Sequence, residues 1–148
     1  MRIASSPVYL DTSALAKIYV AEAESTELES ALLGRRDLIV SDLAVTELTS
    51  AIARRVREVD LSFTDAQGLY RRVLGDLTAG EFRLGELTPD VHREAERLLM
   101  GLGRRVPLRA ADALHLALAA RLGARVLITF DRRMEAAAQA LGTFELPR

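Results

Sequence analysis

The chain has 148 residues, and 49% of them are hydrophobic, which is enough for the core of one domain of ordinary size. The 20 Lys and Arg residues nearly balance the 21 Asp and Glu residues, so the net charge of -1 argues neither for nor against a nucleic acid partner. The absence of Cys excludes a disulfide framework and any Cys-based zinc site, so a bound metal needs oxygen ligands, which favours Mg²⁺ or Mn²⁺. We expect a single domain over residues 1–148.

The amino terminus does not resemble a targeting segment. Residues 1–7 contain no long apolar stretch, and no apolar run elsewhere approaches the length needed to span a bilayer. We therefore expect a cytoplasmic protein without membrane contact.

The first half of the chain predicts two strands and four helices, in the order strand 8–10, helices 14–20 and 24–33, strand 38–40, and helices 43–58 and 63–77. Both strands are short, bulky and apolar. Ser41 or Asp42 is expected to cap the third helix. The third and fourth helices are expected to pair as an antiparallel hairpin.

The second half continues the alternation, in the order weak strand 82–87, helix 88–100, helix 109–122, strand 125–130, helix 132–141 and short strand 143–146. Pro89 stands at the favoured first position of its helix. Strands that alternate with helices or helix pairs are typical of a parallel sheet covered on both faces. The predicted fold class is therefore α/β, a three-layer α/β/α sandwich with a mainly parallel central sheet.

Four acidic side chains fall near predicted strand ends or helix starts. Asp11 and Asp131 each follow a strand at its carboxyl end, where α/β proteins bind ligands. Glu47 lies inside or at the margin of an apolar helix stripe, and Asp112 opens a helix that is apolar nearly all round. Each also has a simpler explanation. Asp11 and Asp131 could be helix caps, Glu47 an exposed helix charge, and Asp112 a charge favoured by the helix dipole.

Together, the four acids indicate a metal site, because all of them can converge on one edge of the sheet. Converging carboxylates repel and raise one another's pKa values unless a cation joins them. We therefore predict a divalent-ion site that cuts phosphodiester bonds.

Two polar residues near these acids are candidates for a supporting role. His115 lies one turn after Asp112 and could act as a general base, although a hydrogen-bonded histidine on a buried helix is the simpler interpretation. Thr129 shares a strand face with Asp131, so its hydroxyl could orient a water or an acid. His92 stands among charged residues and is predicted to be exposed.

Four segments resemble motifs of the PIN-domain nucleases, in the order of that family. They are Leu-Asp-Thr-Ser-Ala-Leu at 10–15, Val-Thr-Glu-Leu at 45–48, Ala-Asp-Ala-Leu-His-Leu-Ala at 111–117 and Ile-Thr-Phe-Asp at 128–131. The first and third motifs are specific, whereas the second alone would match many helices. Within the family, the chain resembles the VapC-like toxins of bacterial and archaeal type II toxin-antitoxin systems.

The resemblance implies a PIN-like fold and a metal-dependent endoribonuclease. It implies that Asp11, Glu47, Asp112 and Asp131 are the catalytic residues and hold Mg²⁺ or Mn²⁺, with supporting roles for Ser13 and Thr129. It also implies an RNA substrate cut to leave a 5′-phosphate and a 3′-hydroxyl, a homodimer, and a cognate antitoxin whose C-terminal segment occupies the active-site groove. No catalytic role for His115 follows from it.

Arg makes up nineteen of the 20 basic residues, often in adjacent pairs. Arg forks match phosphate oxygens bidentately, although genome composition explains the Arg content equally well. Five of these residues flank the third and fourth acids and are candidates for binding the RNA backbone, namely Arg104, Arg105, Arg109, Arg132 and Arg133. Their alternative is a set of solvated helix ends.

Three other interpretations place acids at the strand ends of a similar sheet. A receiver-like signalling domain binds Mg²⁺ but needs a Lys near the end of a late strand, and the only Lys is Lys17. A dehalogenase-like phosphatase needs a second acid two residues after Asp11, where the chain has Ser13. A non-catalytic PIN-fold binding partner stays open, although four intact acids speak against it.

Overall fold

The computed structural model describes residues 1–147. Its strands are β1 (Val8–Leu10), β2 (Leu38–Ser41), β3 (Arg83–Gly85) and β4 (Val126–Ile128). They form one sheet in the order β3-β2-β1-β4, and every neighbouring pair is parallel. Glu145 adds a parallel bridge to Val126 near the end of the chain. The predicted α/β class with a mainly parallel sheet is confirmed.

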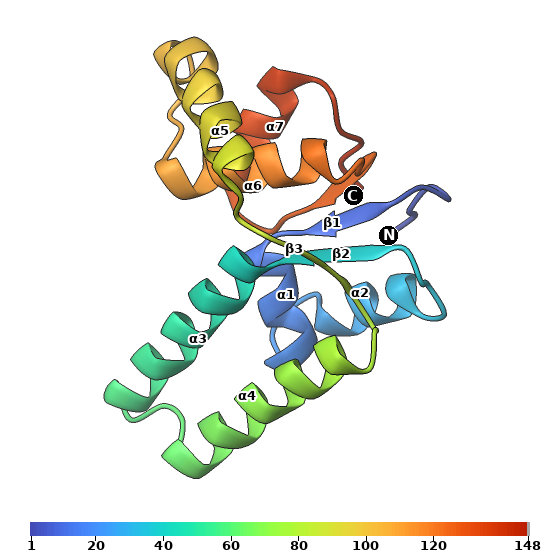
Figure 1. The fold of residues 1–148 in the computed structure, drawn as a ribbon. Helices are drawn as coiled ribbons and strands as arrows, with labels where there is room; N and C mark the ends of the chain where they lie inside the picture. The colour runs from blue at the N-terminus through green and yellow to red at the C-terminus, as the bar shows by residue number, and fades with distance from the viewer. Residues whose placement is uncertain (148) are drawn as a thin grey trace.

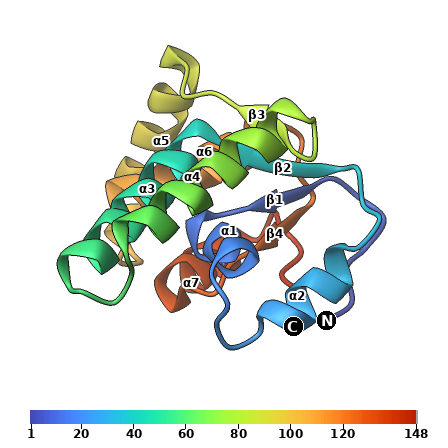
Figure 2. The same cartoon turned by 90° about the horizontal axis from the view of Figure 1, so that it is seen from below.

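Helices cover both faces of this sheet. On one face lie α5 (Pro89–Gly101), α6 (Ala110–Arg121) and α7 (Arg132–Leu141), with the short 3₁₀ helix η1 (Leu102–Arg104) after α5 (Figure 1). On the other lie α1 (Thr12–Tyr19), α2 (Ser25–Leu32), α3 (Asp42–Arg57) and α4 (Phe63–Thr78), where α3 and α4 run side by side as a hairpin (Figure 2). The result is a three-layer α/β/α sandwich. No helix within residues 1–147 is long and apolar enough to cross a membrane.

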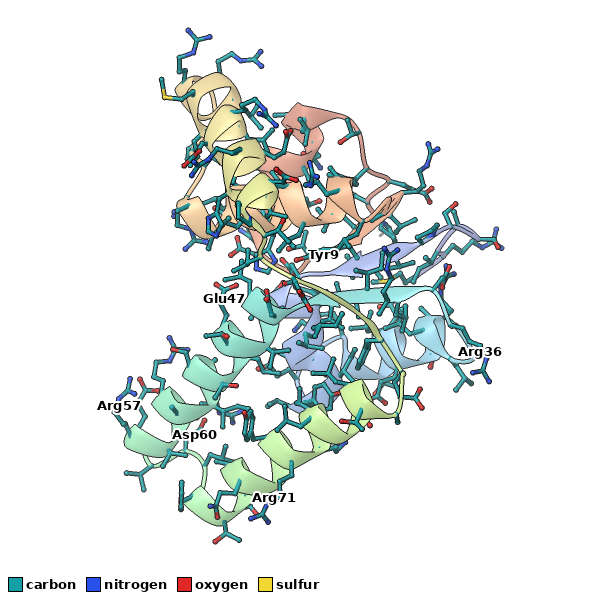
Figure 3. All side chains as sticks on the ribbon, viewed as in Figure 1. Tyr9, Arg36, Glu47, Arg57, Asp60 and Arg71 are labelled. Carbon is teal, nitrogen blue, oxygen red and sulfur yellow. The ribbon has the colours of Figure 1, made fainter. Side chains whose placement is uncertain are left out.

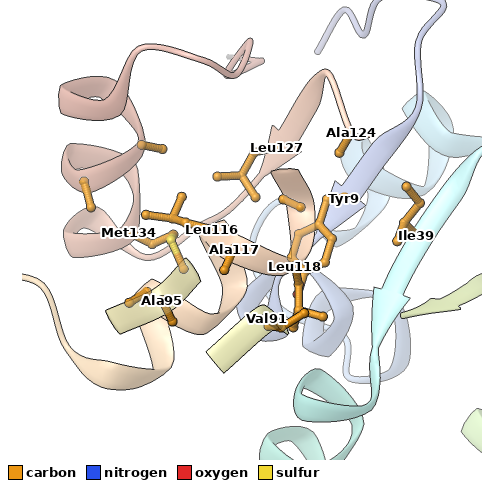
Figure 4. Packing of buried hydrophobic residues seen from close by; sticks show 14 residues of the cluster. Tyr9, Ile39, Val91, Ala95, Leu116, Ala117, Leu118, Ala124, Leu127 and Met134 are labelled. Carbon is orange, nitrogen blue, oxygen red and sulfur yellow. The ribbon is translucent and has the colours of Figure 1, made fainter. Parts of the chain in front are cut away.

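Side-chain alternation along the strands divides the core between the two helical layers. Tyr9, Ile39 and Leu127 point toward α5, α6 and α7, and pack with apolar residues that include Leu116 and Met134 (Figure 4). The residues on either side of them in the strands face α1 and α2, namely Val8, Leu10, Leu38, Val126 and Ile128. Because α6 is buried on most of its surface, its sequence is apolar nearly all round.

Side-chain caps begin the helices that follow the strands. Asp11, Ser41 and Asp131 each accept a hydrogen bond from a backbone amide in the first turn of α1, α3 and α7. The capping interpretation of Asp11 and Asp131 is therefore correct for their local structure. Ser41, rather than Asp42, caps α3.

Three predicted strands are shorter than expected. Strand 125–130 is reduced to Val126–Ile128. Strand 82–87 is reduced to Arg83–Gly85, where a Cβ on Gly85 would overlap the end of the Leu122 side chain, so a larger residue there would require Leu122 to shift. Segment 143–146 is reduced to one bridging residue, Glu145, whose backbone bonds to Arg125 and Leu127.

Candidate active site

All four candidate acids line one pocket at the carboxyl ends of β1 and β4. The pocket walls come from the starts of α1, α6 and α7 and from the second turn of α3, and they comprise Asp11, Thr12, Ser13, Glu47, Arg109, Ala111, Asp112, His115, Asp131 and Met134. Residues up to 123 positions apart in the chain, Asp11 and Met134, thus share one cavity. The predicted convergence of the acids at this edge agrees with their placement.

Asp11 is the most enclosed of the four, with 3% of its surface exposed. Its Oδ1 accepts hydrogen bonds from Ser13 Oγ at 2.6 Å and from the Ala14 amide at 3.0 Å, and its Oδ2 accepts from Thr129 Oγ1 at 2.5 Å. Burial raises the pKa of Asp11, and the hydrogen bonds from Ser13 and Thr129 offset part of that rise. A cation nearby would therefore stabilise its ionised form.

Ser13 and Thr129 also join the two strand ends. Ser13 Oγ accepts the Phe130 amide at 2.8 Å, and Thr129 Oγ1 accepts the Asp131 amide at 3.1 Å. Each hydroxyl therefore orients Asp11 while it holds the backbone that leads into Asp131. The expected supporting position of both residues agrees with these contacts.

Arg109 connects the other two aspartates. Its Nη2 lies 3.4 Å from Asp112 Oδ1 and 3.1 Å from Asp131 Oδ2, and its backbone amide donates to Asp112 Oδ2 at 3.1 Å. The remaining oxygen of Asp131, Oδ1, accepts amides at the start of α7. Partial burial opposes the effect, but these amides and the guanidinium together hold the pKa of Asp131 below its usual range. One positive group thus offsets half of the charge of two neighbouring carboxylates.

Glu47 is held through only one of its two oxygens. Oε1 accepts hydrogen bonds from Thr12 Oγ1 at 2.7 Å and from His115 Nε2 at 2.6 Å, whereas Oε2 has no hydrogen-bond partner among residues 1–147. The bond from His115 lowers the pKa of Glu47, against an opposing effect of burial. Glu47 is therefore a carboxylate at neutral pH, with one oxygen left for a ligand.

His115 is itself fixed from behind by the sheet. Only 3% of the residue is exposed, and its Nδ1 lies 2.7 Å from the hydroxyl of Tyr9, which is also 3.0 Å from Ser41 Oγ. The hydrogen-bonded buried histidine that the sequence offered as the simpler interpretation is thus present. His92 is exposed, as predicted.

A family model described as the PIN domain matches residues 8–140. The chain belongs to the PIN domain family. The resemblance drawn from the four motifs is therefore confirmed.

Relatives of known type agree with this assignment. The chain is 35% identical to Ribonuclease VapC46 of Mycobacterium tuberculosis over 139 residues, which are 91% of this chain and 92% of that protein. It is 36% identical to Ribonuclease VapC49 of the same organism over 138 residues, 91% of each chain. Both relatives are named as ribonucleases.

Solved structures share the fold at low sequence identity. FitAcB from Neisseria gonorrhoeae superposes with a TM-score of 0.71 at 17% identity, covering 95% of this chain and 96% of that one. Mycobacterium tuberculosis VapC20, described as a Sarcin-Ricin loop cleaving toxin, gives a TM-score of 0.68 at 18% identity over 88% and 94%. These solved structures therefore share the fold of this chain over most of its length.

The pocket of this PIN domain offers carboxylate oxygens, which are the ligands that a hard divalent cation prefers. Its oxygens include Glu47 Oε2, while Asp112 Oδ1 and Asp131 Oδ2 have a guanidinium and no backbone group as their partner. Arg109 has 53% of its side chain exposed and so has room to move away. In the geometry described for residues 1–147, no three His, Asp or Glu side chains form a ready metal-binding group. In this arrangement the acids line the pocket, and the guanidinium of Arg109 is the positive group beside Asp112 and Asp131.

The five predicted RNA-binding arginines divide into two groups. Arg109 lines the pocket of the PIN domain, whereas the other four are exposed and do not line it, namely Arg104, Arg105, Arg132 and Arg133. Sequence reasoning missed a second hollow beside the first. It is lined by Glu47, Ser50, Ala51, Arg54 and Arg57 of α3. The signal was present, because spacings of three, four and seven residues put these side chains on one face of a helix.

Proposed function

We propose that this chain is one PIN domain acting as a metal-dependent endoribonuclease, the toxin of a toxin-antitoxin pair. The observation that carries the proposal is the pocket in which four carboxylates from four chain segments meet, in a chain 35% identical to a ribonuclease of the VapC type. We propose a cytoplasmic location, where the protein would meet an RNA substrate.

Asp11, Glu47, Asp112 and Asp131 would hold Mg²⁺ or Mn²⁺, which when bound supplies an acidified water and neutralises charge on the leaving oxygen. The chain's own contribution is orientation. Hydroxyl groups fix Asp11, amides fix one oxygen of Asp131, and Thr12 and His115 fix one oxygen of Glu47. The second oxygens of Glu47 and Asp131 would then be left for the ion. Hydrolysis that leaves a 5′-phosphate and a 3′-hydroxyl needs no covalent enzyme intermediate.

Arg109 would have two roles in this cycle. Before the ion arrives it neutralises Asp112 and Asp131, and afterwards its exposed guanidinium would contact the RNA phosphate at the cut. The flanking exposed arginines would hold the backbone on either side, and the α3 hollow with Arg54 and Arg57 would extend that track.

A cognate antitoxin and a second copy of the chain are the proposed partners. An apolar hollow between α3 and α4 supports the protein partner, because Ile52, Val56, Phe63 and Tyr70 line it and Phe63 is 66% exposed. A toxin-antitoxin complex from Klebsiella pneumoniae has the same fold, with a TM-score of 0.65. We propose that the antitoxin packs on this hollow and sends its C-terminal segment into the acidic pocket, and that the toxin is a homodimer.

Cleavage of a structured RNA mixture by the purified protein, in Mn²⁺ and in chelator, tests the function. We expect Mn²⁺-dependent cleavage, and Asp11→Asn should abolish it because the variant keeps the cap but not the charge. Asp90→Asn is the matched control, since Asp90 is an exposed acid that pairs with Arg121. If wild type and Asp11→Asn are both inactive, the alternative of a non-catalytic PIN-fold binding partner gains support. Family membership removes the basis for the receiver-like alternative.

A further inference from the structure

A line of hydrogen bonds runs from the sheet to the pocket through side chains outside the acidic set. It begins at Ser41, passes through the Tyr9 hydroxyl and the two ring nitrogens of His115, and ends at Glu47 Oε1. The distances along it are 3.0, 2.7 and 2.6 Å. Figure 3 shows Tyr9 beside the sheet and Glu47 near the sheet end of α3.

The chemistry of this line determines which atom of His115 faces the acid. A carboxylate oxygen accepts hydrogen bonds, so the ring nitrogen Nε2, 2.6 Å from Glu47 Oε1, carries a hydrogen and donates this bond. The Tyr9 hydroxyl lies 2.7 Å from Nδ1 and holds the other side of the ring. The imidazole is thus fixed at both nitrogens, in a site where only 3% of the residue is exposed.

The hydrogen bond from His115 helps to fix the orientation of the Glu47 side chain. His115 and Thr12 both bond to Oε1, so the carboxylate plane is set and Oε2 is left directed away from them. Glu47 stands on a helix surface with its side chain 35% exposed, and without these bonds it would have several rotamers. None of the other three acids contacts His115 by a hydrogen bond among residues 1–147.

We propose that His115 is a positioning residue for Glu47, held in its orientation by Tyr9, and that it sets the affinity of the pocket for a divalent cation. The inference rests on the proposed function, because it takes Glu47 as one of the groups that hold the ion. Outer partners that orient a metal-binding carboxylate commonly change metal affinity by about 10-fold to 100-fold when removed.

Two substitutions of His115 separate positioning from packing. His115→Gln puts an amide N–H near the place of Nε2 and keeps a donor to Glu47, whereas His115→Asn reaches only the place of Nδ1. We expect the Mn²⁺ concentration at half-maximal thermal stabilisation to stay near wild type in H115Q and to rise about 10-fold in H115N. In RNA cleavage, H115N should lower kcat with KM unchanged, because the arginines that contact RNA are untouched.

Two milder variants repeat the test with smaller changes, in case a substitution of His115 prevents folding. Tyr9→Phe removes only the hydroxyl and Thr12→Val only the second donor to Oε1, and each should shift the Mn²⁺ midpoint in the same direction as H115N. His92→Gln, at an exposed histidine, should match wild type. Equal midpoints in H115Q and H115N, whether at the wild-type value or equally raised, would overturn the positioning role.

Crystal structures of the metal-free variants keep the inference separate from the proposed function. If the wild type neither binds Mn²⁺ nor cleaves RNA, the proposed function fails, and the structures decide the positioning role alone. We expect the Glu47 carboxylate to keep its place in H115Q and to leave it in H115N. A carboxylate that stays in place in H115N overturns the inference.

Discussion

Arg109 and Asp131 are joined across the mouth of the pocket, with Nη2 of the arginine 3.1 Å from Oδ2 of the aspartate. The same nitrogen lies 3.4 Å from Asp112 Oδ1, so it contacts two carboxylates that start different helices. Among residues 1–147, no backbone amide donates a hydrogen bond to Asp131 Oδ2 or to Asp112 Oδ1, because the amides bond to the other oxygen of each carboxylate. Arg109 therefore occupies the position that a cation shared by the two acids would need.

Arg109→Gln should lower the melting temperature in chelator, because Asp112 and Asp131 then repel each other without a neutralising group. The same variant should bind Mn²⁺ more tightly than wild type, since the ion no longer competes with the guanidinium. Differential scanning fluorimetry across a Mn²⁺ series measures both effects. Arg93→Gln is the matched control, because Arg93 pairs with Glu96 on an exposed helix surface. A Mn²⁺ midpoint equal in R109Q and wild type would show that Arg109 does not compete for the acids.

Mg²⁺ or Mn²⁺ should stabilise the wild type but not an Asp11→Asn, Asp112→Asn double variant. A ligand at 100 times its Kd stabilises a native protein by about 2.7 kcal/mol, and loss of two carboxylates from the pocket removes most of that binding. Chemical denaturation with and without the ion gives the free energy of unfolding directly. Asn keeps an acceptor for the backbone amides at both positions, so the variant should fold, and the comparison is the gain that the ion gives each protein over its own ion-free stability. The same ion-dependent gain in both proteins would place the cation elsewhere.

Local rules predicted most of the fold, because its elements follow local signals. The spacing of apolar residues predicted α3, α4 and α7 to within two residues, and the apolar run around Asp112 predicted a buried helix. The strand at 82–87 was overextended because its length depends on tertiary packing. Only three of its residues pair with β2, and Gly85 lies against Leu122 from α6's end.

The sequence predicted which acids meet in the pocket, but it did not predict the side-chain contacts that hold them in place. Asp11 and Asp131 follow strands, so the rule that ligands bind at carboxyl ends of parallel strands located both. The bond between Tyr9 and His115 joins residues 106 positions apart, and Tyr9 reads from the sequence only as a bulky strand residue. Arg109 is the first residue of the predicted helix 109–122, and its position in the sequence does not indicate a partner. Its link to Asp131 depends on the packing of α6 against α7.

The pH dependence of stability should differ between the wild type and Asp11→Asn in chelator. The pKa of Asp11 is raised in the folded state, mainly by burial, so the folded protein keeps this proton to higher pH than the unfolded chain. The free energy of unfolding therefore falls as the pH rises from about 4, the ordinary Asp value, through the raised folded-state pKa.

Asp11→Asn has no such proton, so its stability relative to wild type should increase across that interval and then level off above the raised folded-state pKa of Asp11. Glu47 and Asp131, whose pKa values are lowered, are present in both proteins, and their contributions cancel in the difference. Urea titrations in EDTA at a series of pH values give this difference. A stability difference that is constant with pH would show that Asp11 is not destabilised as a buried charge.

Arg54 and Arg57 should act on RNA as a continuation of the pocket along α3. Figure 3 shows Glu47 near the sheet and Arg57 at the far end of the helix, and the hollow between them is lined by Arg54. Each phosphate contact on a single strand contributes about 0.7 to the salt slope of binding. The double variant Arg54→Ala, Arg57→Ala should therefore raise KM and flatten the plot of log KM against log salt by about 1.4, with kcat retained.

The control removes the same charge elsewhere. Arg36 and Arg71 are exposed, and Figure 3 places both well away from Glu47. If Arg36→Ala, Arg71→Ala changes the salt slope as much as the α3 variant, net charge rather than a track beside Glu47 explains the RNA contact. A slope change confined to the α3 variant, together with an unchanged Mn²⁺ midpoint, would place RNA phosphates along α3 and leave the acids as a separate site for the ion.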